Sequence, residues 1–174
     1  MTLLDLYCGV GGWSKVFAER GWICTGVDLL DFSSSYPCKF VLEDARNWFP
    51  RIAQFDAVVA SPPCEEFARF CLPWIGRAPK VEEAKQLLRD TVAAVGNRGV
   101  VECSNFSARF VGGGVKIKSH TLWGDVPLLL PVWSGKGKIS GKRPDLRAEI
   151  PPILARCVES WLRQSVRSRV LGNP

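Results

Sequence analysis

The sequence predicts an α/β fold, a doubly wound and mostly parallel sheet, in a single domain over residues 1–174. Three observations indicate this fold class. The chain opens with an apolar strand, a glycine-rich turn and a helix, which form the first unit of such a fold. Further short β-branched runs alternate with helical patterns, which favours parallel strands. A chain of 174 residues can bury a substantial core, and we find neither an internal repeat nor a second domain.

The opening unit predicts a ligand site at a glycine turn. A strand at residues 2–7 runs into the turn at 8–12, and residues 13–20 have helical spacing. Glycines let a backbone approach a ligand closely, and the first turn of a helix favours polar or anionic groups. A second strand, at 22–27, ends at Asp28, where an acidic residue commonly binds the two hydroxyls of a ribose.

This unit is compatible with either a dinucleotide or S-adenosylmethionine. Ser14 stands where the third separated glycine of the dinucleotide fingerprint would fall, so that fingerprint is incomplete. The sequence also places no catalytic His, Tyr or Lys near this turn. Both facts disfavour an NAD-dependent oxidoreductase.

The third expected strand, at residues 38–42, precedes Asp44. The Asp44 carboxylate could accept a hydrogen bond from an adenine amino group. Alternatively, it could be the N-cap of a helical segment at 45–52. The two roles are compatible, and the sequence leaves both open.

The fourth strand, at residues 55–60, leads into Ser61, Pro62, Pro63 and Cys64. Two consecutive prolines fix φ and remove two backbone donors, so we expect a stiff corner with Cys64 just beyond it. A thiol on a rigid loop at the end of a central strand is well placed to meet a ligand. The alternative is a small buried hydrophobic side chain, which is the usual state of a free cysteine.

A fifth strand, at residues 99–103, follows the clearest helix of the chain, at 79–95. We expect this strand to end in Glu102, whose carboxylate is costly to bury without a partner or a function. A Glu that reaches solvent at the sheet edge is the alternative. Because parallel strands end at one edge, Cys64, Glu102 and the glycine turn should converge on one crevice.

The remaining chain predicts smaller elements. Residues 115–122 alternate as an amphipathic strand, 123–127 form a turn, and 128–133 are a last strand. Residues 134–147 are rich in glycine and lysine and predict a basic flexible loop. A final helix is expected at 151–166, with proline near its start.

Composition limits the functional classes. The net charge of +6 gathers in the loop at 134–147 and in arginines of the last helix, which suits a nucleic acid or a nucleotide phosphate. Seven cysteines without a CxxC pair and a single histidine argue against a disulfide framework and a metal centre, so we expect no metal and a reduced protein. No apolar run is long enough to cross a bilayer.

The motifs, in their order along the chain, resemble those of the DNA cytosine-C5 methyltransferases, the Dcm-like class that uses S-adenosylmethionine. Residues 5–14 are similar to the first motif of the family, and Asp28 and Asp44 match its two acidic positions. Residues 61–64 match the nucleophile loop, Glu102 matches the Glu of the Glu-Asn-Val motif, and residues 150–155 are similar to the last motif.

The resemblance implies a Rossmann-like S-adenosylmethionine-dependent methyltransferase fold and methylation of C5 of cytosine in DNA. It implies Cys64 as the nucleophile and Glu102 as the group that binds the base. The positions matched to cofactor binding are Asp5, Tyr7, Cys8, Gly9, Gly11, Gly12, Asp28, Leu29, Asp44, Ala45 and Pro62. The candidates for substrate binding are Ser61, Pro63, Arg69, Arg109, Lys116 and Lys118.

Two departures from the family pattern keep alternatives open. The Gln-x-Arg-x-Arg motif is not recognisable, because the equivalent stretch, residues 116–123, holds no arginine. The target-recognition domain is also missing, as in small phage-type members. The substrate is therefore DNA or a free cytidine nucleotide, and a specificity partner or a non-catalytic nucleic-acid-binding protein stay as alternatives. We expect a cytoplasmic protein of a bacterial or phage-infected cell and make no prediction of its oligomeric state.

Overall fold

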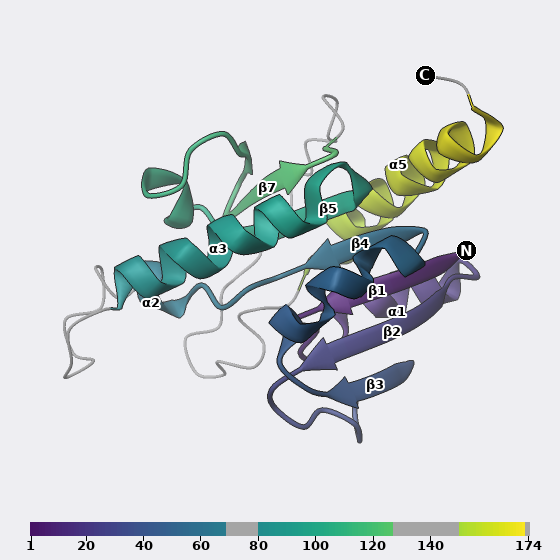
Figure 1. Ribbon diagram of the computed structural model, residues 1–174, viewed down its shortest axis with the longest axis horizontal. Helices are drawn as coiled ribbons and strands as arrows, with labels where there is room; N and C mark the ends of the chain where they lie inside the picture. Colours follow the sequence, from purple (N-terminus) through teal and green to yellow (C-terminus); the bar gives the residue numbers. More distant parts are fainter. Residues whose placement is uncertain (69–79, 127–149, 173–174) are drawn as a thin grey trace.

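The computed structural model describes residues 1–68, 80–126 and 150–172. Within them, one sheet has the strand order β3-β2-β1-β4-β5-β7-β6 (Figure 1). Strands β1 to β5 are parallel, whereas β7 runs antiparallel to both of its neighbours. The strands are β1 Thr2–Leu6, β2 Ile23–Asp28, β3 Lys39–Leu42, β4 Ala57–Ala60, β5 Gly99–Ser104, β6 Val115–Ile117 and β7 His120–Gly124.

Helices cover both faces of this sheet. Helices α1 and α5 pack on one face, while α3 and the 3-10 helix η1 pack on the other, where they lie in front of the sheet in Figure 1. The α-helices are α1 Gly12–Glu19, α2 Glu65–Ala68, α3 Val81–Val95 and α5 Pro152–Leu171. The 3-10 helices are η1 Ala45–Gln54, η3 Gly96–Arg98 and η4 Ser107–Arg109.

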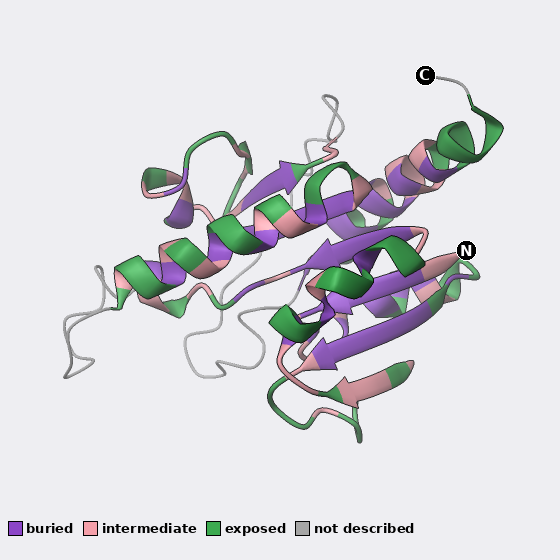
Figure 2. Ribbon diagram, viewed as in Figure 1, coloured by how far each residue is buried: buried purple, intermediate pink, exposed green. Residues whose placement is uncertain are grey.

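The central strands are apolar on both faces because both are covered. Leu3, Leu4 and Leu6 of β1 are completely buried, and so is all of β4 (Figure 2). The edge strand β3 is only partly covered. Continuous apolar runs of this kind are typical of parallel strands in doubly wound folds. The predicted fold class, a doubly wound and mostly parallel sheet of the Rossmann-like methyltransferase type, is confirmed.

The strand order creates a topological switch point between β1 and β4. From β1 the chain proceeds outward through β2 to β3, and it then returns to β4 and continues outward on the other side. Ligands of such sheets bind where the strand order reverses, at the carboxyl ends of the strands. The glycine turn follows β1 and the Ser61–Cys64 corner follows β4, so both flank this point.

Three predicted elements differ in the structure. Residues 115–122 are not one strand but the β6–β7 hairpin, because Lys118 has a φ of 54° and reverses the chain. Trp123 and Gly124 therefore belong to β7 and not to a turn. Strand β5 continues past Glu102 to Ser104, because Cys103 and Ser104 pair with β7.

Helix α5 is longer than predicted and closes one face of the sheet. It extends to Leu171, and its buried face contributes Leu154, Val158 and Leu162 to the core around α1. The described helices include none that is long and apolar enough to cross a membrane. The predicted strand at 128–133 and the basic loop at 134–147 lie outside the described residues.

Candidate active site

The turn after β1 leaves open space beside Asp28. Gly9 and Gly11 have positive φ values of 50° and 86°, which glycine adopts without strain. The Gly9 amide donates to Asp28 Oδ2 over 2.9 Å, and the Leu30 amide donates to Oδ1 over 3.0 Å. A Cβ added at Gly9 would meet nothing within 4 Å. A ligand can therefore lie against this backbone with the Asp28 carboxylate next to it.

Exposed apolar side chains surround Asp28. Leu29 and Leu30 follow it directly, Leu42 pairs with it across β2 and β3, and Val10 lies in the glycine turn. All four are exposed, although apolar side chains gain by burial. An open glycine turn, a carboxylate and a group of uncovered apolar side chains fit the ribose and base of an adenosine-containing cofactor.

Asp44 is the N-cap of η1. Its carboxylate accepts from the Arg46 amide over 2.9 Å and forms an ion pair with the Arg46 guanidinium. Hydrogen bonds from Arg46 lower the pKa of this carboxyl group. The capping role that the sequence left open is therefore present, while binding of an adenine amino group by Asp44 stays a prediction.

Asp5 supports the glycine turn from inside the protein. Its side chain is fully buried, and Oδ2 accepts hydrogen bonds from Ser14 over 2.7 Å and from Tyr36 over 3.2 Å. Burial raises the pKa of Asp5 to about 7. Cys8 and Ala45 are also buried, and their side chains belong to the core. These three predicted cofactor residues can reach a ligand only through their backbone or by shaping the turn.

The remaining predicted cofactor residues lie along the same edge. The backbone of Tyr7 has a φ of 57°, and its hydroxyl lies 3.2 Å from the hydroxyl of Thr91. A Cβ at Gly11 would come within 2.6 Å of Pro37, and one at Gly12 within 3.1 Å of the Ile150 backbone. The space beside these two glycines is thus filled by the protein itself, unlike that beside Gly9.

The proline corner holds Cys64 beside the end of β5. Ser61 is fixed on two sides, because its amide donates to Leu6 and its hydroxyl accepts from the Trp13 indole over 3.0 Å. Pro62 is buried, Pro63 is exposed, and α2 begins directly after Cys64. The corner is thus bound to both β1 and α1. This agrees with the stiff corner that the two prolines predict.

Cys64 has partners that stabilise its thiolate. Its thiol forms a hydrogen bond with Cys103, and the backbone of Ser104 also lies within hydrogen-bond reach of it. These contacts, the one with Cys103 first, lower the pKa of Cys64, although burial and the charge of Glu102 act in the opposite direction. The pKa of the deeply buried Cys103 is raised. Since the thiolate is the nucleophilic form, Cys64 is the more reactive of the two thiols.

Glu102 is partnered by the histidine of β7. The carboxylate Oε1 lies 2.7 Å from His120 Nδ1, and the two side chains are only 11% and 15% exposed. The alternative of a Glu in open solvent is therefore wrong. Sequence reasoning missed His120. The contact depends on the pairing of β5 with β7, and the single strand expected at 115–122 did not predict that pairing.

Three of the four basic candidates for substrate binding lie in the described residues. Arg109 is exposed over the Phe106 ring, and Lys116 pairs with Thr121, so its side chain lies on the sheet face opposite that of His120. Lys118 is exposed in the hairpin turn, and Arg69 lies outside the described residues.

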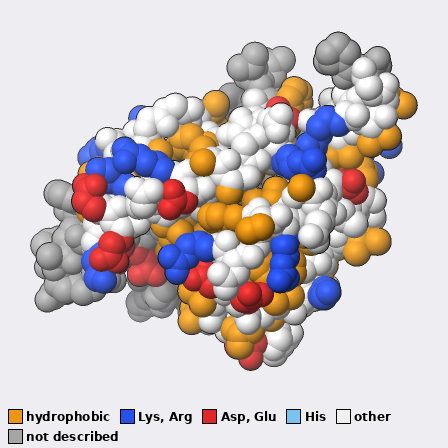
Figure 3. Space-filling view, in the orientation of Figure 1, with side chains coloured by type: hydrophobic (Ala, Val, Ile, Leu, Met, Phe, Trp, Pro, Cys, Tyr) orange, Lys and Arg blue, Asp and Glu red, His pale blue; other side chains and the backbone are white. Residues whose placement is uncertain are grey.

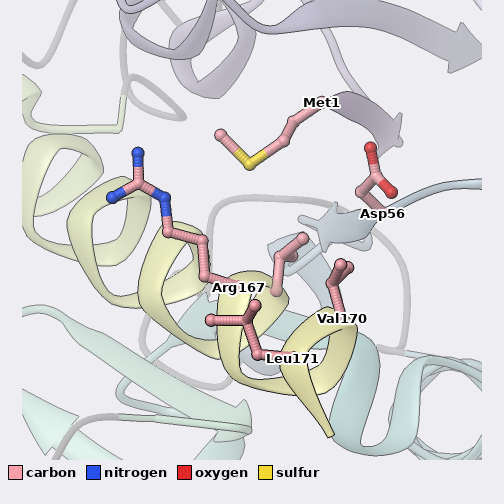
Figure 4. A pocket seen from close by; sticks show the side chains of 6 residues that line it. Met1, Asp56, Arg167, Val170 and Leu171 are labelled. Atoms are coloured by element: carbon pink, nitrogen blue, oxygen red, sulfur yellow. The ribbon is translucent and has the colours of Figure 1, made fainter.

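Two arginines of α5 bind other parts of the fold. Arg163 forms an ion pair with the buried Glu159, and Arg169 donates to the Asp56 carbonyl. Arg167 lines a surface hollow of about 340 Å³ together with Met1 and Asp56 (Figure 4). Met1 and Asp56 precede β1 and β4, so this hollow lies at the sheet edge opposite Cys64. It offers no nucleophile and is separate from the candidate site.

Two curated proteins match part of the chain. The chain is 40% identical to a probable DNA (cytosine-5)-methyltransferase of Frog virus 3 (isolate Goorha) over 79 residues, which cover 44% of this chain and 35% of that protein. It is 44% identical to the putative methyltransferase YqeM of Bacillus subtilis (strain 168) over 66 residues, which cover 33% and 27%. The chain thus spans about a third or less of the length of these relatives, and no family model matches it.

Solved structures were matched at low identity. A putative DNA modification methyltransferase encoded within a prophage of E. coli matches with 18% identity and a TM-score of 0.42, over 62% of this chain and 33% of that one. Human methyltransferase-like protein 13 in complex with SAH matches with 14% identity and a TM-score of 0.42, over 94% and 82%. At TM-scores below 0.5, these likenesses carry no argument about substrate or mechanism.

The sheet topology is that of the Rossmann-like methyltransferase fold, and the chain is similar to a probable and a putative methyltransferase over part of its length. More narrowly, the chain resembles the DNA cytosine-C5 methyltransferases over the matched 79 residues, so the resemblance indicated by its motifs is confirmed.

Proposed function

We propose that this protein transfers a methyl group from S-adenosylmethionine to C5 of cytosine in DNA through a covalent adduct of Cys64. One observation carries the proposal: the Cys64 thiol, whose pKa is lowered, follows β4 at the switch point and interacts with the buried Glu102 of the neighbouring strand β5, while the open glycine turn follows the adjacent β1. A purely structural scaffold has no need of this combination. The partial similarity to a probable DNA (cytosine-5)-methyltransferase supports it.

The residues around the glycine turn fit the proposed cofactor. The Asp28 carboxylate would bind the ribose hydroxyls, and Leu29 and the other exposed apolar side chains would cover the adenine. When bound, S-adenosylmethionine supplies an electrophilic methyl group. The protein would therefore have to present cytosine C5 between this turn and Cys64.

The chemistry assigned to Cys64 is activation of a poorly nucleophilic carbon. Its thiolate forms a bond to C6 of cytosine, which makes C5 nucleophilic enough to accept the methyl group. Glu102 accepts a hydrogen bond from the exocyclic amino group and gives a proton to N3 as negative charge develops there. Loss of the C5 proton to water, return of the N3 proton and cleavage of the Sγ–C6 bond restore the enzyme. A base in duplex DNA would have to be flipped out of the stack.

The test is transfer of labelled methyl from S-adenosylmethionine to duplex DNA, single-stranded DNA and free deoxycytidine monophosphate, measured in parallel. We expect label on DNA cytosine, a loss of at least 10³-fold in Cys64→Ala, and unchanged transfer in Cys157→Ala, since Cys157 lies on α5 away from the site. Transfer that survives Cys64→Ala would refute the covalent mechanism. Cofactor binding without transfer to any substrate would favour a non-catalytic nucleic-acid-binding protein.

A free cytidine nucleotide is the second candidate substrate, and one observation favours it. Arg163 and Arg169 of α5 bind within the fold, and the view in Figure 3 shows basic and acidic side chains interspersed and no continuous basic surface. Salt dependence separates the two substrates. Binding of DNA through several phosphates should weaken steeply between 50 and 200 mM salt, with a slope of about −0.9 per phosphate contact, whereas a mononucleotide should respond weakly.

A further inference from the structure

His120 and Glu102 form a pair that belongs to the sheet. Ser104 pairs with His120 and Glu102 with Leu122, so Glu102 and His120 are diagonal neighbours on one face of β5 and β7. The 2.7 Å distance between Nδ1 and Oε1 is that of a strong, charge-assisted hydrogen bond. Because both residues lie in paired strands, the contact does not depend on a loop.

The contact uses one lone pair of Oε1. The second lone pair of Oε1 can accept from the exocyclic amino group, and Oε2 is the atom that would give its proton to N3. A hydrogen bond from Nδ1–H stabilises the carboxylate that remains once Oε2 has given its proton to N3. The pair can therefore make Glu102 a better proton donor without the imidazole touching the substrate.

His120 is the residue of this stretch whose side chain the structure places on the base-binding carboxylate. Residues 116–123 hold no arginine, and His120 is the single histidine of the sequence. An imidazole presents one N–H to a carboxylate oxygen, whereas a guanidinium can bind both oxygens at once.

We propose that His120 is the positioning residue that holds Glu102 toward the cytosine. This inference rests on the proposed methyltransferase function. The thiol of Cys64 interacts with Glu102 from the corner after β4, whereas Cys103, the next residue of β5, lies on the opposite face of the sheet. Lys116 of β6 lies on the opposite face of the sheet, and Lys118 lies in the turn before β7.

Two variants of His120 separate positioning from simple packing. His120→Asn keeps an N–H donor near the place of Nδ1, while His120→Leu keeps volume and removes the donor. We expect His120→Leu to lower kcat by about 10- to 100-fold, the range for a lost hydrogen bond to a charged group, with little change in the KM for DNA or in cofactor affinity. We expect His120→Asn to retain kcat at pH 7 within about fivefold, because its amide N–H takes the place of Nδ1–H.

The inference is overturned if His120→Leu keeps the kcat of the wild type. It is also overturned if both variants lose activity equally while cofactor affinity stays intact, because the donor then has no special role. Thermal unfolding of each variant shows whether it is folded. If His120→Leu does not fold, the kcat of His120→Asn decides the test.

A measurement that needs no activity keeps the inference separate from the proposed function. Because the sequence holds one histidine, untagged protein gives one imidazole Cε1–H signal in its NMR spectrum. Glu102→Gln should shift this signal at constant pH, whereas Glu43→Gln should not, since Glu43 accepts from Trp48 after β3. An unmoved signal refutes the pair, and a wild type without methyl transfer refutes the proposed function alone.

Discussion

At the scale of single residues, Cys103 controls the reactivity of Cys64. Its hydrogen bond is the main cause of the lowered pKa of Cys64. We expect Cys103→Ala to raise the pKa of Cys64 and to slow its alkylation by iodoacetamide at pH 7.5 by several-fold, because the thiolate fraction falls. Peptide mass spectrometry over time measures the rate at Cys64 alone. Cys157→Ala is the matched control, and equal rates in both variants would contradict the assigned role of Cys103.

Asp5 makes folding stability depend on pH. Burial raises its pKa from 3.8 to about 7, so the folded protein binds this proton more tightly than the unfolded chain does. Its contribution to stability is therefore full below pH ~4 and is lost as pH rises through about 7, by up to about 4 kcal/mol at 1.36 kcal/mol per pH unit.

Asp5→Asn tests this dependence, because an amide cannot titrate. Urea unfolding of both proteins at pH 5 and pH 8 gives the comparison. We expect the free energy of unfolding of the wild type to fall more between these pH values than that of the variant. The contributions of all other groups are the same in the two proteins and cancel when the two changes are subtracted. An equal fall of the free energy of unfolding in both proteins would therefore show that Asp5 is ionised throughout.

At the scale of elements, Gly26 lets the segment before β3 close over β2. A Cβ at Gly26 would overlap the Tyr36 ring, whose hydroxyl donates to Asp5. We expect Gly26→Ala to lower the free energy of unfolding by about 1–3 kcal/mol, because the ring must leave its site. Gly112→Ala is the control, since nothing lies within 4 Å of its added Cβ. Equal urea midpoints for the two variants would contradict this packing argument.

The sequence predicted those elements that a pattern of neighbouring residues specifies. The glycine turn, the proline corner and the alternation of strands and helices are patterns of neighbouring residues, and they placed Cys64 and Glu102 at one edge of the sheet. His120 and Cys103 act through the pairing of strands that are distant in sequence, and no local pattern encodes that register. Lys118 reversed the chain at a positive φ that its residue type does not predict. The buried location of Asp5 likewise depends on Tyr36, which is 31 positions away.

At the scale of the whole molecule, α5 completes the core that α1 begins. Leu162 is fully buried in the cluster that also contains Leu3, Phe17 and Trp22. We expect Leu162→Ala to lower the free energy of unfolding by about 2–5 kcal/mol, the range for a buried leucine that leaves a cavity. Leu171→Ala, at an exposed position of the same helix, should change it by less than about 0.5 kcal/mol. Chemical denaturation measures both, and similar losses would mean that α5 does not pack as described.

The place of α5 also affects how the protein is made. Residues 152–171 cover the face of the sheet that residues 2–28 start to build, so more than a hundred further residues are synthesised before that face is closed. Until then, apolar side chains of β1, α1 and β2 are open to water and to other chains. Contacts over such long sequence separations slow folding and favour aggregation of the unfinished chain. Expression at low temperature or together with a holdase chaperone should therefore raise the yield of folded protein.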